Sequence, residues 1–314
     1  MTCPRSQLIS ISDTPYYHCV SRCVRRAFLC GSDLDGNSFE HRRGWIVDRI
    51  KLLASAFSIN VCAYAVMSNH YHLLLRVDLE QPHEWTQSEV IQHWLTLFAG
   101  PEIIRRHQRL LLTTSAELEV VSKIVEDWRV RLSSISWFMK CLNEPIARMA
   151  NSEDKCTGHF WESRFKSQAL LDDTAVLSCM AYVDLNPIRA DICNSPEECD
   201  YTSIQERLGL DPATGRSSND KSLGAKVDSG TQPQSKLLAF AGHDHIDNNP
   251  KHLPFSLLEY FELVDWSLLC ILHARHSNIL VHRPADKCEM ISAVLYRLDY
   301  RQYCKGFTFK QING

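Results

Sequence analysis

The sequence contains no run of apolar residues that approaches the roughly 20 needed to span a membrane. Its first residues, Met-Thr-Cys-Pro-Arg, lack the hydrophobic segment of a signal peptide. It also lacks an excess of basic charge, because 34 Lys and Arg are offset by 37 Asp and Glu, for a formal net charge of -3. These absences predict a soluble, cytoplasmic protein without a membrane partner, whose attraction to phosphate comes from local basic patches.

The 13 cysteines do not include a Cys-x-x-Cys pair. Cys19 and Cys23 are four positions apart, which suits neither a zinc knuckle nor a redox motif. In a cytosolic protein most of these thiols are expected to be reduced and to pack as small apolar groups. The cysteine pattern therefore does not favour a structural zinc site.

Apolar spacing predicts strands and helices through the first two thirds of the chain. Strands are expected at 16–23, 59–66, 70–77 and 167–171, and helices at 38–57, 85–111, 118–149 and 172–186. Short connections favour antiparallel pairing of neighbouring strands. This order of elements predicts an α+β fold in which helices pack on a mostly antiparallel sheet.

A length of 314 residues suggests about two domains. Residues 208–235 are rich in Gly, Ser, Asp, Lys and Pro and have no apolar period, which predicts a flexible linker. The linker separates a first domain, residues 1–207 with a helical insert at about 80–150, from a small, mainly helical C-terminal module at 236–314. In that module helices are expected at 253–272 and 291–300, and His243 and His245 lie in a loop that does not aim them as metal ligands.

The stretch Met67-Ser68-Asn69-His70-Tyr71-His72-Leu73-Leu74-Leu75-Arg76-Val77 begins with turn residues and continues as a strand. Residues i and i+2 of a strand point to the same face, roughly 6.5 Å apart. His70 and His72 are therefore placed to bind one metal ion from a rigid element, while Tyr71 faces an apolar layer. For an isolated His-x-His pair, the simpler interpretation is two polar residues on a half-exposed strand.

Tyr182 and Asn186 are four positions apart in a helix expected to end before Pro187, so they share a helix face. Asn186 offers an amide oxygen of the kind that hard divalent cations bind, and imidazoles suit Mn²⁺ as well as Mg²⁺. A tyrosine hydroxyl, with a pKa of about 10, is a poor nucleophile near pH 7 and needs a metal to neutralise a phosphate. The alternative is a buried Tyr182 and an Asn186 that caps the helix.

Four motifs occur in order within residues 12–195: Tyr17-His18-x-Val20-x-Arg22, the stretch from Met67 to Leu74, Phe160-Trp161-x-x-Arg164-Phe165, and Tyr182-Val183-Asp184-Leu185-Asn186-Pro187-Ile188-Arg189-Ala190. Together they resemble the single-tyrosine HUH transposases, most closely the REP-associated tyrosine transposase branch. The resemblance implies a ferredoxin-like or RRM-like HUH endonuclease domain that nicks and rejoins single-stranded DNA.

By the family pattern, His70, His72 and Asn186 are the ligands of a divalent metal, Mg²⁺ or Mn²⁺, and Tyr182 is the nucleophile. The tyrosine would form a 5'-phosphotyrosine link and leave a free 3'-hydroxyl, and this link would store the bond energy for rejoining. The implied partner is single-stranded or hairpin DNA. Whether the protein is a monomer or a homodimer stays open.

Single-stranded nucleic acid is generally bound by aromatic residues that stack on bases and basic residues that contact phosphates. The candidates here are Arg22, Arg25, Arg26, Trp161, Arg164 and Lys166. Two other functions fit the same motifs: a non-catalytic, domesticated regulator that recognises hairpin DNA without cutting it, and a metal-dependent hydrolase that uses water. The helical insert and the C-terminal module exceed the minimal domain, so the resemblance implies no role for them.

Overall fold

The computed structural model describes residues 9–24, 29–31, 36–209, 237–241 and 252–276. Within these ranges the chain is an α+β protein with one four-stranded sheet in the order β2-β3-β1-β4. Its strands are β1 (Tyr16–Arg22), β2 (Ile59–Val66), β3 (His70–Val77) and β4 (Lys166–Ala169). Every neighbouring pair runs antiparallel, which confirms the predicted α+β class and the antiparallel sheet.

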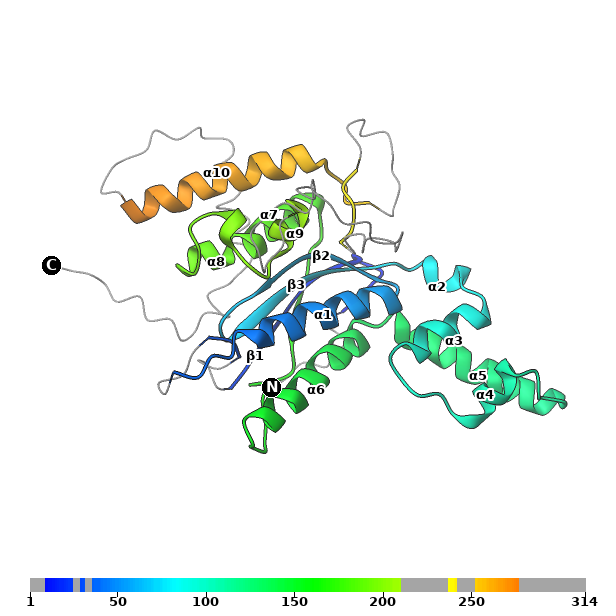
Figure 1. Ribbon diagram of the computed structural model, residues 1–314. Coiled ribbons are helices and arrows are strands. Elements are labelled where there is room, and N and C mark those ends of the chain that lie inside the picture. The colour runs from blue at the N-terminus through cyan, green and yellow to red at the C-terminus, as the bar shows by residue number, and fades with distance from the viewer. Residues whose placement is uncertain (1–8, 25–28, 32–35, 210–236, 242–251, 277–314) are drawn as a thin grey trace, which may run out of the picture.

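Helices cover both faces of the sheet (Figure 1). On one face lie α1 (His41–Ala56) and α6 (Ile135–Glu153), and on the other lies α7 (Asp173–Asp184), with α10 (Leu257–His276) packed on its outer side. The sheet therefore lies between helices, with an apolar core on each side.

The alternation of β3 explains how one strand serves both cores. Tyr71, Leu73 and Leu75 belong to the core under α1 and α6, whereas Leu74 belongs to the core under α7 and α10. Successive side chains of a strand point to opposite faces, so the near-continuous apolar run after the histidines is what a sheet covered on both sides requires. The histidines at the start of the strand lie on the α7 side.

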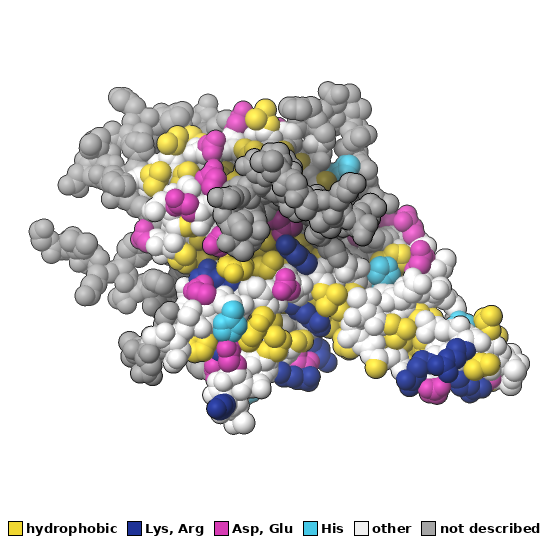
Figure 2. Space-filling model, viewed as in Figure 1, with side chains coloured by type: hydrophobic (Ala, Val, Ile, Leu, Met, Phe, Trp, Pro, Cys, Tyr) yellow, Lys and Arg dark blue, Asp and Glu magenta, His cyan; other side chains and the backbone are white. Residues whose placement is uncertain are grey.

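Four helices form an arm beside the sheet: α2 (Gln81–Glu84), α3 (Gln87–Leu95), α4 (Glu102–Gln108) and α5 (Ser115–Leu132). Thr86 and Thr114 open α3 and α5 with capping boxes. The arm extends away from the sheet in Figure 1, and Figure 2 shows Lys and Arg side chains gathered over it.

Two of the predicted helices are wrong in extent. The helix expected at 85–111 is divided between α3, which ends at Leu95, and α4, which starts at Glu102 after the extended residue Pro101. The helix expected at 118–149 is divided between α5 and α6 at Ser133, whose hydroxyl donates to the carbonyl oxygen of Arg129 at 2.9 Å. Such a side-chain bond competes with continued helix.

Most of the C-terminal expectations fall outside the described residues. This holds for residues 210–235 of the predicted linker, for His243 and His245, and for the helix expected at 291–300. The helix expected at 253–272 is present as α10, shifted toward the C-terminus. No helix in the described ranges is long and apolar enough to cross a membrane.

Cysteine usage follows the expectation for most thiols. In the described part of the chain eight cysteines are thiols outside any disulfide, and six of them are buried. The sequence pattern does not single out the remaining pair, Cys193 and Cys199, which form a disulfide that closes a short loop between α8 (Asn186–Arg189) and α9 (Ser203–Arg207).

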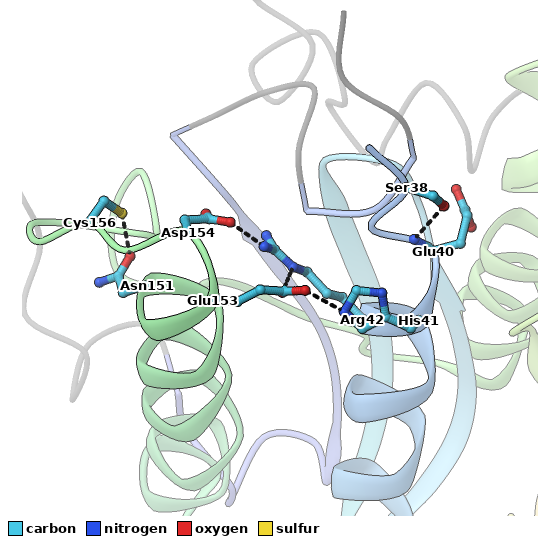
Figure 3. A network of polar contacts seen from close by, with 8 residues as sticks. All are labelled: Ser38, Glu40, His41, Arg42, Asn151, Glu153, Asp154 and Cys156. Atoms are coloured by element: carbon cyan, nitrogen blue, oxygen red, sulfur yellow. Dashed lines mark hydrogen bonds and ion pairs between the residues drawn. The ribbon is translucent and has the colours of Figure 1, made fainter. Parts of the chain in front are cut away.

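A buried arginine fixes α1 to α6 (Figure 3). The Arg42 side chain is fully buried at the start of α1, and its Nε donates to Glu153 Oε2 at 2.7 Å. Its Nη2 donates to Asp154 just after α6, and its guanidinium lies 4.2 Å from the ring centroid of Phe39. Both partner carboxylates keep some contact with solvent. This side chain therefore joins two helices of one layer through charge, not through apolar packing.

Replacing Arg42 is expected to destabilise the fold. Arg42→Met removes the buried cation that Glu153 and Asp154 share, and we expect it to lower the free energy of unfolding by about 3 kcal/mol. Arg148→Met is the matched control, because it removes an exposed i,i+4 pair with Glu144 and is expected to cost about 0.5 kcal/mol. Urea denaturation measures both values, and equal losses would contradict a special role for Arg42.

Candidate functional site

The paired histidines lie at the start of β3. The side chains of His70 and His72 share one face, and their Nε2 atoms are 3.0 Å apart. Tyr71 points to the other face, where its side chain is fully buried and its hydroxyl donates to Asn143 Oδ1 at 2.6 Å. The strand therefore separates the two histidines from the aromatic residue between them, as predicted.

A third histidine joins the pair from β1. His18 Nε2 lies 2.9 Å from His72 Nδ1, and both side chains are buried. On the other side, His70 Nδ1 donates to the Asn69 side-chain oxygen at 2.6 Å. The result is a continuous chain of contacts from His18 through His72 and His70 to Asn69.

All three imidazoles are neutral near pH 7. Burial lowers the pKa of His18 to about 3, with a further contribution from His70. Burial, and then the Arg22 guanidinium, lowers the pKa of His70 to about 4. Burial and the two neighbouring rings hold the pKa of His72 well below its ordinary value. Neutral rings keep lone pairs for a cation.

The His70 and His72 pair fits a divalent cation. Two nitrogens 3.0 Å apart have the separation of adjacent ligands at a right angle around an ion with bonds of about 2.1 Å. Among the described residues, no group of three or more His, Cys, Asp and Glu side chains could hold a metal ion. A cation on this pair would therefore complete its shell with amide, water or phosphate oxygens.

Tyr182 lies against these imidazoles from the next layer. Helix α7 packs on the histidine face of the sheet, and the centroids of Tyr182 and His72 are 5.6 Å apart with ring planes at 85°. The centroid of His18 lies 6.3 Å from that of Tyr182. Tyr182 is half-buried, and the Arg189 guanidinium lies 5.5 Å from its ring centroid. Segments far apart in sequence thus meet at one place.

Local sequence explains where α7 begins and ends. Asp172 caps the helix by accepting from the Ala175 amide at 2.7 Å. The helix ends at Asp184, because Leu185 leaves helical geometry with φ -89° and ψ 1° just before Asn186 and Pro187.

Asn186 therefore starts the short helix α8 and does not continue the helix of Tyr182, so the prediction of one shared helix is wrong. Within the part of the chain that the structure describes, we find no hydrogen bond from the Asn186 side chain to the histidines or Tyr182. Its role as a ligand stays a prediction.

Two of the predicted DNA-contacting residues lie on the histidine face. Arg22 is the cross-strand partner of His70, close enough for its charge to lower the pKa of that ring. Lys166 pairs with Val20, which pairs in turn with His72, so the three side chains form one row across the sheet. Arg25 and Arg26 lie outside the described residues.

Trp161 and Arg164 belong to the opposite face. The Trp161 indole donates to the Asn143 carbonyl oxygen at 2.8 Å, and its ring centroid lies 5.7 Å from that of Tyr71. Both residues line a groove of about 590 Å³ between α6 and the segment 158–165. The structure therefore does not bring these two residues together with the histidines.

His18 is the site residue that sequence reasoning missed. It occurs in the same strand as Arg22 and shares its face, because their spacing is a multiple of two. That alternation was visible in the sequence. The pairing of β1 with β3, which places His18 beside His72, was not.

Comparison with known proteins finds one remote likeness. No protein-family model and no curated protein matches the chain significantly. A solved structure of the REP-associated tyrosine transposase bound to a REP hairpin aligns with 73% of this chain and 100% of its own, at 11% identity and a TM-score of 0.39. At such values the likeness is too remote to transfer an activity or a residue role to this chain.

A buried carboxylate holds the Tyr182 helix in place. Asp184 accepts from Ser203 Oγ at 2.5 Å, from the Ile204 amide at 3.0 Å, and from the Tyr260 hydroxyl of α10. Burial raises the pKa of Asp184 to about 6, against 3.8 for an exposed carboxyl. The helix that carries Tyr182 is thereby tied to both α9 and α10.

Asp184 is expected to make stability depend on pH. Because its folded pKa exceeds its unfolded pKa, its contribution is present below pH 3.8 and is lost as pH rises through about 6. The difference in unfolding free energy between the wild type and Asp184→Asn should fall by roughly 2 kcal/mol from pH 4 to pH 7. The comparison cancels the opposite effect of the histidines. A constant difference across that range would contradict the assignment.

Proposed function

We propose that the chain is a DNA strand-transfer enzyme, a transposase or single-stranded DNA endonuclease in which Tyr182 attacks a DNA phosphate with the help of a divalent metal. The observation that carries the proposal is the meeting of Tyr182 with His72, at 5.6 Å between ring centroids, beside the paired Nε2 atoms of His70 and His72. The phenol and the two imidazoles thus lie on the same side of the sheet, and Tyr182 is only half-buried.

The reaction is an exchange of phosphate esters. The Tyr182 oxygen forms a bond to phosphorus as the bond from phosphorus to the 3'-oxygen breaks, and the proton lost by the phenol balances the one gained by the 3'-hydroxyl. Reversal by another 3'-hydroxyl rejoins the strand without nucleotide hydrolysis. A Mg²⁺ or Mn²⁺ ion on His70, His72 and Asn186 would neutralise phosphate charge.

Basic side chains around the phenol support this chemistry. The Arg189 guanidinium lies 5.5 Å from the Tyr182 ring centroid, so its positive charge is placed to attract a phosphate beside the phenol. Arg22 and Lys166 share the face of the histidines, and we expect them to contact phosphates of the bound strand. These three residues give the site local positive charge, although the net charge of the chain is -3.

The order of the strands and helices supports a ferredoxin-like domain. Strands β1, β2, β3 and β4 with crossover helices α1 and α6 follow the βαββαβ sequence, in the sheet order β2-β3-β1-β4. We interpret this as the ferredoxin-like HUH arrangement that the four sequence motifs imply. The same motifs are the basis for proposing single-stranded or hairpin DNA as the substrate.

A covalent adduct tests the proposal. Incubation of the full chain with hairpin-flanked single-stranded DNA and Mn²⁺ should give a denaturant-resistant protein–DNA adduct. Tyr182→Phe should abolish the adduct, because a phenylalanine has no oxygen to attack phosphorus. Tyr201→Phe, at a partly buried tyrosine outside the site, should retain it. Binding without any adduct would favour the hairpin-binding regulator, and cutting by Tyr182→Phe would favour the hydrolase.

Metal binding gives an independent test of the histidine pair. His70→Ala and His72→Ala are each expected to weaken Mn²⁺ binding more than about 10-fold, since even changes that only orient a ligand have effects of that size. The control is His83→Ala, at an exposed histidine of the arm. Calorimetric titration measures the affinities, and unchanged binding in the His70 and His72 variants would refute the site.

A further inference from the structure

His18 occupies the centre of the site without any role in the reaction described above. Its side chain is 3% exposed, and it lies on β1 opposite Leu74 in the register with β3. Its ring plane is within 7° of that of His72, and the nearest nitrogens, at 2.9 Å, are closer than the centroids, at 5.1 Å. The contact is therefore made between ring edges, along the direction in which an imidazole donates or accepts a hydrogen bond.

The hydrogen bonds determine which nitrogen of each neutral ring carries its proton. The Asn69 side-chain oxygen is an acceptor, so the proton of His70 is on Nδ1 and its Nε2 bears a lone pair. In the 3.0 Å contact between the two Nε2 atoms, His72 must then be the donor. His72 Nδ1 consequently accepts from Nε2 of His18.

That protonation pattern is incompatible with a cation shared by His70 and His72. His70 already presents a lone pair from Nε2, but His72 presents a proton. For Nε2 of His72 to act as a ligand, the single proton of its neutral ring must be on Nδ1. That proton then needs an acceptor, and Nε2 of His18 is the atom in position at 2.9 Å.

We propose that His18 is a positioning residue, which accepts the Nδ1 proton of His72 and so fixes the tautomer in which Nε2 of His72 can bind a divalent cation. The proton count balances. Nε2 of His72 releases one proton, the Nε2 proton of His18 passes to Nδ1 of His72, and Nδ1 of His18 takes up one. Each ring stays neutral, and the inference rests on the proposed function, because it concerns the same metal site.

Two substitutions separate this role from simple packing. His18→Gln keeps a polar atom near the position of Nε2, whereas His18→Leu fills the space without one. If His18 fixes the tautomer, Mn²⁺ binding to the full chain should weaken 10- to 100-fold in His18→Leu and stay within about 3-fold of wild type in His18→Gln. If His18 only packs, the leucine variant should bind like wild type.

Nitrogen NMR of the full chain, labelled with ¹⁵N-histidine, provides a readout that does not depend on activity. In the metal-free wild type, His72 should be protonated on Nε2, and saturating Mg²⁺ should move the proton to Nδ1. Retention of the Nε2 proton with Mg²⁺ bound would overturn the inference, and this measurement applies even if His18→Leu fails to fold.

The outcomes also distinguish this inference from the proposed function. Normal Mn²⁺ binding by both His18 variants, with adduct formation intact, would refute the role of His18 and leave the strand-transfer reaction standing. Absence of Mn²⁺ binding in the wild type would refute the metal site and His18 together. Adduct loss in Tyr182→Phe, together with Mn²⁺ binding that is weakened in His18→Leu and kept in His18→Gln, would support both.

Discussion

The antiparallel pairing of β1 with β3 is the constraint on which the site depends. Its register places Arg22 opposite His70 and Val20 opposite His72, so the alternate side chains of β1 converge on the histidine pair. Because the side-chain period of a strand is two, a shift by one residue would turn His18 and Arg22 to the opposite face. The apolar cores on both sides of the sheet oppose such a shift, since Tyr17 and Cys19 would leave theirs. Packing thereby fixes the geometry of the polar groups.

The second constraint is the attachment of α7 to its surroundings. Tyr182 is carried by a helix that packs on the sheet through one face, and Asp184 anchors that helix to α9 and α10. The anchor is a buried carboxylate with three donors, which favours one arrangement of the helices over others of similar apolar contact. The distance between phenol and imidazole is in this way determined by residues that touch neither. Helix α10 contributes directly to it through Tyr260.

Much of this could be predicted from the sequence because the signals are local. Apolar period, turn residues and capping predict the bounds of β2 and β3, the start of α7 at Asp172, and the opposite directions of His70 and Tyr71.

What could not be predicted depends on contacts between distant segments. His18 requires the register of β1 with β3, and the separation of Trp161 from Arg22 requires knowing which face the segment 158–165 covers. The helix break at Leu185 has a different cause. Pro187 predicts that the helix ends nearby, but the exact position of its last turn does not follow from the sequence.

The central claim is that a phenol and two imidazoles surround one cation, and paramagnetic broadening tests it most directly. In the full chain carrying ¹³C-labelled tyrosine, bound Mn²⁺ should broaden the ring signal of Tyr182 more than that of any other described tyrosine. The effect should disappear when His70 and His72 are both replaced by alanine. A Tyr182 signal that stays sharp at saturating Mn²⁺, or broadening that persists without the two histidines, would contradict the account.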